Sequence, residues 1–297
     1  MSGSQPEFER LYLRQILAQK IGEADSPKLR LDRAVLELAT IQFPDLEIEA
    51  CLDRLNELAS HLGDRLRNFN DGREFVEKAQ QYLFEELGFH GNETDYFDPL
   101  NSCLNQVLER RTGIPVSLSV MYMEVARRLA MPVFGIGLPR HFIIQFDDGN
   151  YAAYIDPFHG GRPVSPRDIL ILSGAAEPNS PLVPAMLPSI LRRVSKKEIA
   201  MRMLRNLQRD YIARRDWARA LETLHLLILG IGSPGGALDQ ELAAAHKLRS
   251  TLHLELNHYS AARADLEMYL RILPDAPDIA DIRQQIETVH RRLARLN

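Results

Sequence analysis

The spacing of hydrophobic residues changes twice along this sequence, and this change restricts the possible folds more than any other feature. Apolar residues recur at the three- and four-residue spacing of amphipathic helices between residues 31 and 87, and again from residue 195 onward. Three short runs between them have the composition of strands: Val133–Leu138, His141–Phe146 and Tyr151–Ile155. Because turn-forming residues separate the last two runs, we predict a hairpin there. A helix followed by an antiparallel meander indicates an α+β core.

The 297 residues suffice for about two domains, and the patterns divide them into three regions. We expect residues 1–90 to form an N-terminal helical region packed on the core. Residues 91–194 are expected to form the α+β core, and residues 195–297 a helical array. The many prolines of residues 157–195 favour a segment that wraps the core or acts as a connector.

The core begins with an aperiodic segment that is rich in glycine, aspartate, asparagine and aromatic residues, GFHGNETDYFDPLNS (88–102). We predict a loop that packs on the body of the protein. A helix is expected over Cys103–Arg111, with Asn101 or Ser102 as its cap. A second helix is expected over about Pro115–Leu129. Proline early in its first turn costs little, because the N–H that it lacks would be unsatisfied there anyway.

The C-terminal region contains an internal repeat. The segments DWARALETLHLLI (216–228) and HYSAARADLEMYL (258–270) place an aromatic residue, a small alanine and a leucine at equivalent positions. Their offset is 42 residues, which becomes 34 if the eight residues Ile231–Leu238 are an insertion. A helix–turn–helix period of this length is typical of tetratricopeptide repeats. We therefore predict a tetratricopeptide-like array that docks on the core, because two units are few for a free solenoid.

Composition excludes several classes of protein. The two cysteines, Cys51 and Cys103, cannot build a disulfide framework or a structural zinc cluster. The first residues lack the basic and apolar segments of a signal peptide, and no apolar run reaches the ~18 residues that a transmembrane helix needs. The formal net charge of −4 comes without a dense basic face, which argues against nucleic-acid binding. We expect a soluble, cytoplasmic protein with no membrane span and no nucleic-acid partner.

One pair of residues is a candidate for chemistry. His141 begins one predicted strand and Asp156 ends the next, so antiparallel pairing can bring their side chains within hydrogen-bond range. This is the orienting geometry of a nucleophile–His–Asp triad. The nucleophile is then expected at the start of the helix near residue 115, where the helix dipole lowers the pKa of a thiol. No cysteine occurs there.

The stretch 91–161 has a distinctive sequence, GNETDYFDPLNSCLNQVLERRTGIPVSLSVMYMEVARRLAMPVFGIGLPRHFIIQF…YIDPFHGG. It resembles the transglutaminase-like core of the bacterial SirB-type proteins, in which tetratricopeptide-like helices follow the core. The resemblance extends over about residues 25–295. It implies an α+β, papain-like core with a cysteine at a helix start, a histidine on a strand and an aspartate on the next strand.

The resemblance assigns these three positions residue by residue. Registered through the turn Ala130–Pro132, the cysteine position falls on Pro115, and the other two fall on His141 and Asp156. A second departure is Arg140, which stands where the related pattern has glycine. Its charge would disfavour the imidazolium form of the neighbouring histidine, although the aspartate could offset this. The resemblance therefore implies a remnant triad without its nucleophile.

Two kinds of side chain remain as replacements for the missing thiol. Ser117 or Ser119 could act instead, but each lies further into the helix, and helix caps or core hydroxyls are commoner roles for such serines. Cys103 could approach from the preceding helix, but it lies on an apolar stripe, which favours a packed thiol. Neither replacement is the preferred interpretation.

A metal site formed by His141, Asp156 and His159 is disfavoured, because the spacing of these residues is irregular and no further carboxylate is near. We expect no cofactor and no metal.

The resulting hypothesis is a non-catalytic transglutaminase-like protein that binds a protein or peptide partner as an assembly or regulatory adaptor. Binding would use the remnant cleft around Pro115, His141 and Asp156 and the face of the helical repeats. The alternative hypothesis is a cysteine- or serine-dependent hydrolase or acyltransferase, with His141 as base and Asp156 orienting it.

Overall fold

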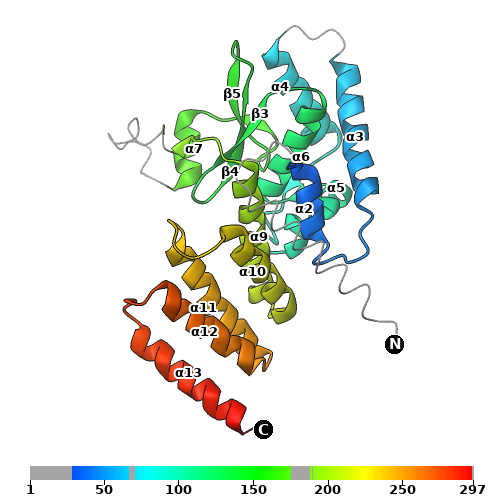
Figure 1. Cartoon of the computed structure of the whole chain (residues 1–297). Helices are drawn as coiled ribbons and strands as arrows, with labels where there is room; N and C mark the ends of the chain where they lie inside the picture. The colour runs from blue at the N-terminus through cyan, green and yellow to red at the C-terminus, as the bar shows by residue number, and fades with distance from the viewer. Residues whose placement is uncertain (1–28, 67–70, 175–187, 189, 296–297) are drawn as a thin grey trace. The chain divides into compact units, whose positions relative to one another are not determined.

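The computed structural model describes residues 29–66, 71–174, 188 and 190–295 of the chain (Figure 1). The described residues fall into two compact units, which meet in sequence within one helix, between Met203 and Leu204. The first is an α+β unit and the second is a helical unit. No helix among the described residues combines the length and the apolar character that crossing a membrane requires.

The α+β unit contains helices around a small antiparallel sheet, as the sequence predicted. Its helices are α2 (Leu31–Ala39), α3 (Ile48–Arg65), α4 (Gly72–Gln80), the π-helical η1 (Gln81–Glu86), the 3-10 helix η2 (Pro99–Ser102), α5 (Leu104–Arg110), α6 (Pro115–Arg128), α7 (Pro166–Ser173) and the first part of α9 (Lys196–Ala213). Its strands are β1 (His90–Gly91), β2 (Thr112–Gly113), β3 (Val133–Gly137), β4 (Phe142–Asp147), β5 (Ala152–Asp156) and β6 (Arg162–Pro163).

The main sheet is an antiparallel meander in the order β3-β4-β5-β6. Its first three strands lie within one residue of the predicted bounds. The register pairs Gly137 with Phe142 across the first hairpin and Ile144 with Ile155 across the second. β1 and β2 form a separate, short parallel pair, which ties the start of the loop 88–102 to the segment before α6.

The central strand β4 is covered on both faces. Phe146 stacks 5.3 Å from the Phe75 ring of α4, and this ring in turn lies edge-on to Tyr122 of α6. On the other face, Ile143 packs in a cluster with Ile169 of α7. Because both faces are buried, the strand is apolar almost throughout. α7 lies within residues 157–195, for which the sequence predicts a wrapping or connecting segment and no helix.

The start of α5 differs from the expectation. Neither Asn101 nor Ser102 caps it; the residue at the cap position is Cys103, whose side chain makes no capping hydrogen bond. The amide of Asn101 is instead used inside the preceding loop, where it donates to the carbonyl of Asp95 at 2.7 Å. Because the Asn101 side chain is hydrogen-bonded within the loop, it does not cap α5. α5 ends at Arg111, which has a left-handed backbone (φ 56°).

A buried charge cluster joins α2 to α6. Asp32 is fully buried and accepts hydrogen bonds from Arg30 at 2.9 Å, Arg127 at 3.1 Å and Arg128 at 2.8 Å. Burial alone would raise the pKa of Asp32, but the hydrogen bond from Arg30, with others, lowers it to about 2. Burial and the charge of Asp32 raise the pKa of Glu124, which pairs with the same α6 arginines.

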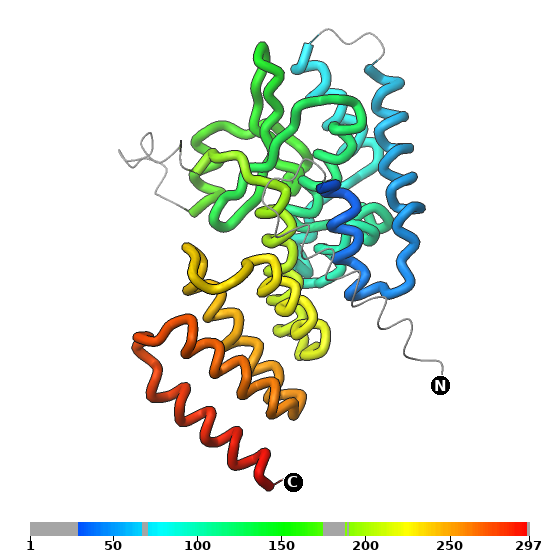
Figure 2. The backbone as a smooth tube through the Cα atoms, viewed as in Figure 1, coloured from blue at the N-terminus to red at the C-terminus, as the bar shows by residue number. Residues whose placement is uncertain are grey.

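The helical unit consists of the rest of α9 with α10 (Trp217–Ile231), α11 (Asp239–Glu255), α12 (Tyr259–Ile272) and α13 (Ile279–Ala294), which Figure 2 traces as successive tubes. Two helices of this unit begin after the same backbone geometry. Trp217 and Tyr259 open α10 and α12, and each is preceded two residues earlier by a left-handed residue, Arg215 (φ 57°) and Asn257 (φ 59°).

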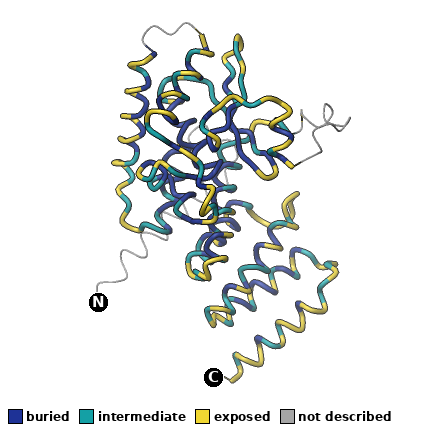
Figure 3. The backbone as a smooth tube through the Cα atoms, turned by 180° about the vertical axis from the view of Figure 1, so that it is seen from behind, coloured by how far each residue is buried: buried dark blue, intermediate teal, exposed yellow. Residues whose placement is uncertain are grey.

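α13 is the most exposed helix of the helical unit, as Figure 3 shows. Its buried residues are Ile282 and Val289, which lie on the side that faces its neighbours. The remaining surface of this helix is therefore available for contact with other molecules.

A second buried polar cluster lies in the helical unit. Asp265 accepts a hydrogen bond from His246 at 2.8 Å and two from Arg249, the shorter at 2.6 Å. Burial, and next the charge of Arg249, lowers the pKa of His225. Burial also lowers the pKa of His253, against the opposing charge of Asp265.

We expect these histidines to make the stability of the helical unit sensitive to acid. Because the folded state disfavours the protonated forms of His225 and His253, the unfolded chain binds more protons as the pH falls through about 6.5, the ordinary pKa of histidine. We expect the helical unit to lose stability between pH 8 and pH 5.5. Hydrogen exchange of the full chain, compared over amides 217–272 at the two values, measures it. Replacing both histidines with glutamine should remove the dependence, and its persistence would contradict this assignment.

Candidate functional site

The hairpin register explains how His141 and Asp156 meet. Ile144 pairs with Ile155, so the next residue of β5, Asp156, lies opposite Ile143. Residues two apart along a strand share a face of the sheet, so His141, two residues before Ile143, lies on the same face as Asp156. The Nε2 atom of His141 lies 2.9 Å from Oδ2 of Asp156, and both side chains are buried. Arg202 of α9 holds the backbone of this turn, because its guanidinium donates to the carbonyls of Leu138 and His141.

The Asp156 carboxylate accepts from both sides. Its Oδ2 also lies 2.7 Å from Nδ1 of His159, while Oδ1 accepts the backbone N–H groups of Phe158 at 3.0 Å and His159 at 3.4 Å. Burial would raise the pKa of Asp156, but the hydrogen bonds from His141 and then His159 lower it. The group is therefore an ionised acceptor, so each histidine donates to it from the nitrogen that faces it.

His159 is the residue whose position the sequence did not predict. It follows β5 in a turn that continues through Gly160 (φ 80°) and Gly161 (φ 67°), and this turn directs its ring back toward Asp156. The rings of His141 and His159 lie 5.6 Å apart, and about half of the His159 side chain is exposed. The spacing Asp-x-x-His followed by two glycines was the available signal, but the spacing of the whole set argued against a shared site.

Aromatic residues form one wall of the site. The ring of Phe158 lies edge-on to His141 at 5.9 Å and to His159 at 5.0 Å. Tyr96, from the loop 88–102, packs against the same ring at 6.0 Å. Gly91 is required beneath it, since a Cβ there would lie 2.5 Å from the Phe158 ring. The predicted packing of the loop on the body of the protein thus builds a side of the site.

No reactive group stands at the position expected for a nucleophile. Pro115 is buried at the start of α6. The hydroxyl of Ser117 is buried and already bonded: it donates to the carbonyl of Asn101 at 2.6 Å and accepts the N–H of Ile114 at 3.1 Å. Ser119 is fully buried as well, and its hydroxyl has no partner among the described residues. These serines have the environment of cap and core hydroxyls.

The two cysteines lie in environments that suppress thiolate formation. Cys103 is buried, and burial raises the pKa of its thiol to about 12. Its Sγ lies 3.5 Å from the carbonyl of Pro99. Burial also raises the pKa of Cys51 on α3. A reactive thiol needs the opposite, an electropositive and partly exposed setting.

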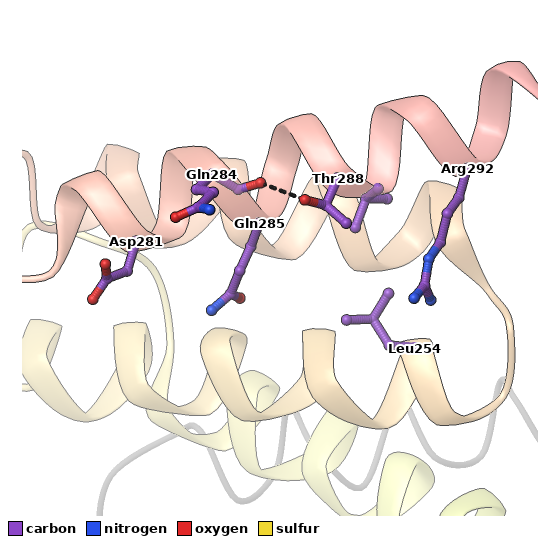
Figure 4. Close-up of a pocket in the computed structure, with 7 residues that line it drawn as sticks. Leu254, Asp281, Gln284, Gln285, Thr288 and Arg292 are labelled. Atoms are coloured by element: carbon purple, nitrogen blue, oxygen red, sulfur yellow. Dashed lines mark hydrogen bonds between the residues drawn. The ribbon is translucent and has the colours of Figure 1, made fainter.

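A groove in the helical unit is a separate candidate for binding. Figure 4 shows polar side chains of α13 pointing toward α11 along this groove. Its volume is ≈ 460 Å³, and it is lined by Leu254, Asp281, Gln284, Gln285, Thr288, Val289 and Arg292.

Comparisons with known proteins agree with the α+β fold. The family model described as the transglutaminase-like superfamily matches residues 49–205. The chain is 32% identical to a UPF0162 protein of Xylella fastidiosa (strain 9a5c) over 273 residues, which cover 90% of this chain and 92% of that protein. It is 32% identical to a UPF0162 protein of Pseudomonas aeruginosa over 250 residues, 83% of this chain and 86% of that one.

A further relative is a much longer protein that shares only part of this chain. F-box only protein 21 of Mus musculus is 35% identical over 133 residues, which are 42% of this chain and 20% of that protein. No solved structure matches the chain.

Proposed function

Since the chain belongs to the transglutaminase-like superfamily, we propose that it is a non-catalytic member that acts as an adaptor by binding a protein or peptide. One observation carries the proposal: the His141–Asp156 pair is assembled, but the helix start that should supply a nucleophile holds Pro115. Proline offers no side-chain atom that could attack an acyl group. The pair therefore orients a base that has no partner for acyl transfer.

We further propose that the chain is a SirB-type protein and that it is cytoplasmic. We propose that its regions are residues 1–90, 91–194 and 195–297, and that the last region contains tetratricopeptide-like repeats. The equivalent left-handed turns at Arg215 and Asn257 support the repeat.

The alternative, a cysteine- or serine-dependent hydrolase or acyltransferase, finds little support. It would need Ser117 to break its hydrogen bonds to the backbone, or Cys103 to ionise in a buried apolar site. An activity-based probe for serine or cysteine hydrolases distinguishes the two functions. We expect no labelling of the native chain beyond that of His141→Ala, and labelling that requires His141 would favour the enzyme.

The groove between α11 and α13 is the proposed surface for the partner. Gln284 and Gln285 present amides, which both donate and accept hydrogen bonds as an extended peptide backbone requires. Asp281 and Arg292 lie at opposite ends of the groove in Figure 4, so the two ends differ in charge. In F-box only protein 21, the segment similar to this chain makes up 20% of the protein. This supports the proposal that such a core functions together with other domains.

Truncating polar side chains of the groove should weaken partner binding. We expect the pair Gln285→Ala and Arg292→Ala to reduce capture of partner proteins by the full chain about tenfold, since an exposed arginine that a partner buries on binding commonly contributes more than 1 kcal/mol. Crosslinking in cells followed by quantitative mass spectrometry measures the loss. The matched control is Glu287→Ala with Arg291→Ala, on the side of α13 that faces α12. Equal capture by all variants would exclude this groove.

A further inference from the structure

We propose that His141, Asp156 and His159 form a binding site for a transition-metal ion of the zinc class. These are two imidazoles and one carboxylate, the same kind of ligand set that holds zinc in many catalytic sites, where a fourth position stays open. The proposal does not depend on the adaptor function, because it concerns the α+β unit alone and its test requires no partner.

The three ligand atoms already converge. One ligand atom from each of His141, Asp156 and His159 lies within 4.8 Å of the other two, and Oδ2 of Asp156 lies 2.9 Å from Nε2 of His141 and 2.7 Å from Nδ1 of His159. Zinc bonds of about 2.0–2.1 Å at tetrahedral angles place ligand atoms about 3.3 Å apart. The two nitrogen–oxygen separations of 2.9 and 2.7 Å would therefore widen by about half an ångström as an ion enters. The half-exposed ring of His159 has room for this movement.

Metal binding requires no proton to leave the two imidazole rings, because each ring can change its tautomer. Without metal, each ring donates from the nitrogen that faces Asp156. With metal, that nitrogen must offer a lone pair, so the ring proton is carried on the other nitrogen, Nδ1 of His141 and Nε2 of His159. Neither atom has a hydrogen-bond partner among the described side chains, so the exchange of tautomers breaks no other interaction. Two neutral imidazoles and one carboxylate leave a divalent ion with a net charge of +1.

The surroundings of the site support a ligand role. Both backbone N–H groups that bind Oδ1 fix the carboxylate and aim its other oxygen at the two rings. Phe158 shields the site on one side, while the exposure of His159 leaves another side open to solvent. A histidine that only oriented Asp156 would duplicate what His141 and the backbone already do. The second imidazole is explained if the set binds an ion.

Metal titration of the untagged, chelator-treated full chain tests the proposal. We expect one Zn²⁺ per chain by calorimetry, and ligand-field absorption bands of low coordination number when Co²⁺ replaces it. His159→Gln should weaken binding about 100-fold or more, since loss of mere outer partners of a metal ligand already costs 10- to 100-fold. Binding should also weaken in acid, because protons compete for the imidazole nitrogens. The circular dichroism spectrum of His159→Gln should match that of the native chain, since this side chain is half-exposed.

Two control variants identify the site. His90→Gln removes an exposed histidine of the same unit, whose ring contacts Gly88 and Thr112. His258→Gln removes one of two imidazoles that lie 3.4 Å apart in the helical unit. Both should bind Zn²⁺ as the native chain does. Absence of stoichiometric binding by the native chain, or a loss that follows His258 and not His159, would overturn the proposal. Neither result bears on partner capture by the groove.

Discussion

Replacing Asp32 with alanine is expected to lower the free energy of unfolding of the α+β unit by about 3 kcal/mol at pH 7, because it removes the carboxylate from a buried ion cluster. Three guanidinium groups converge on this side chain, and Glu124 pairs with two of them, Arg127 and Arg128. Arg128 is affected most, since it is largely buried. Urea denaturation of the full chain, followed by hydrogen exchange in α2 and α6, measures the loss.

The pH dependence separates this electrostatic effect from lost packing. The pKa of Asp32 is lowered to about 2 in the folded state, against about 3.9 in an unfolded chain. Its ionised form therefore stabilises the fold above pH 3.9, and that contribution disappears as the pH falls through about 2. The difference between the native chain and Asp32→Ala should shrink over this interval. Asp53→Ala, an exposed carboxylate on α3, should change stability by less than about 0.5 kcal/mol. A penalty for Asp32→Ala no larger than that of Asp53→Ala would contradict the role of the cluster.

Local periodicity predicted the elements that make up most of the α+β unit, and long-range contacts explain what it missed. The strands before and after the turn 147–150 alternate or run apolar over short lengths, which is why their bounds were predicted within one residue. η1 interrupts an otherwise regular helical stripe after Gln80, and the stripe contains no signal for that change. Asp32 and Arg128 lie 96 residues apart, so no local pattern could pair them.

In the candidate site, too, some residues could be predicted from local sequence and others depend on long-range or turn geometry. His141 and Asp156 could be placed together from strand adjacency alone, because antiparallel neighbours share a face. The position of His159 depends on the backbone of the turn through Gly160 and Gly161, which the spacing of ligands along the chain does not encode. The engagement of Ser117 likewise depends on a carbonyl 16 residues away. Strand adjacency therefore accounts for His141, which directly precedes β4, and for Asp156, which ends β5, while the turns and loops complete the site.

Placing a thiol at the start of α6 tests whether Pro115 occupies the position of a nucleophile. We expect Pro115→Cys to react with a small methanethiosulfonate or iodoacetamide probe about tenfold faster at pH 6 than an ordinary thiol. We expect the helix N-terminus and an ion pair with protonated His141 to outweigh the burial of position 115 and to lower the pKa of the new thiol by about two units, which raises its thiolate fraction nearly a hundredfold. The lower basicity of that thiolate offsets about a factor of ten. Proline at the first position of a helix makes no intrahelical N–H bond, so its replacement leaves the backbone pairing of α6 intact.

The matched control for this variant is Asp239→Cys, at the first residue of α11, where a helix N-terminus is present without His141. It measures the effect of the helix alone. Adding His141→Ala to Pro115→Cys should lower the labelling rate to that of this control or below it, because the imidazole is removed while position 115 stays buried. The native cysteines give a low background, since burial raises the pKa of both thiols. If the thiol at position 115 reacts no faster than the control and is indifferent to His141, then position 115 is not the nucleophile position. The case for a non-catalytic protein would then lose its main support.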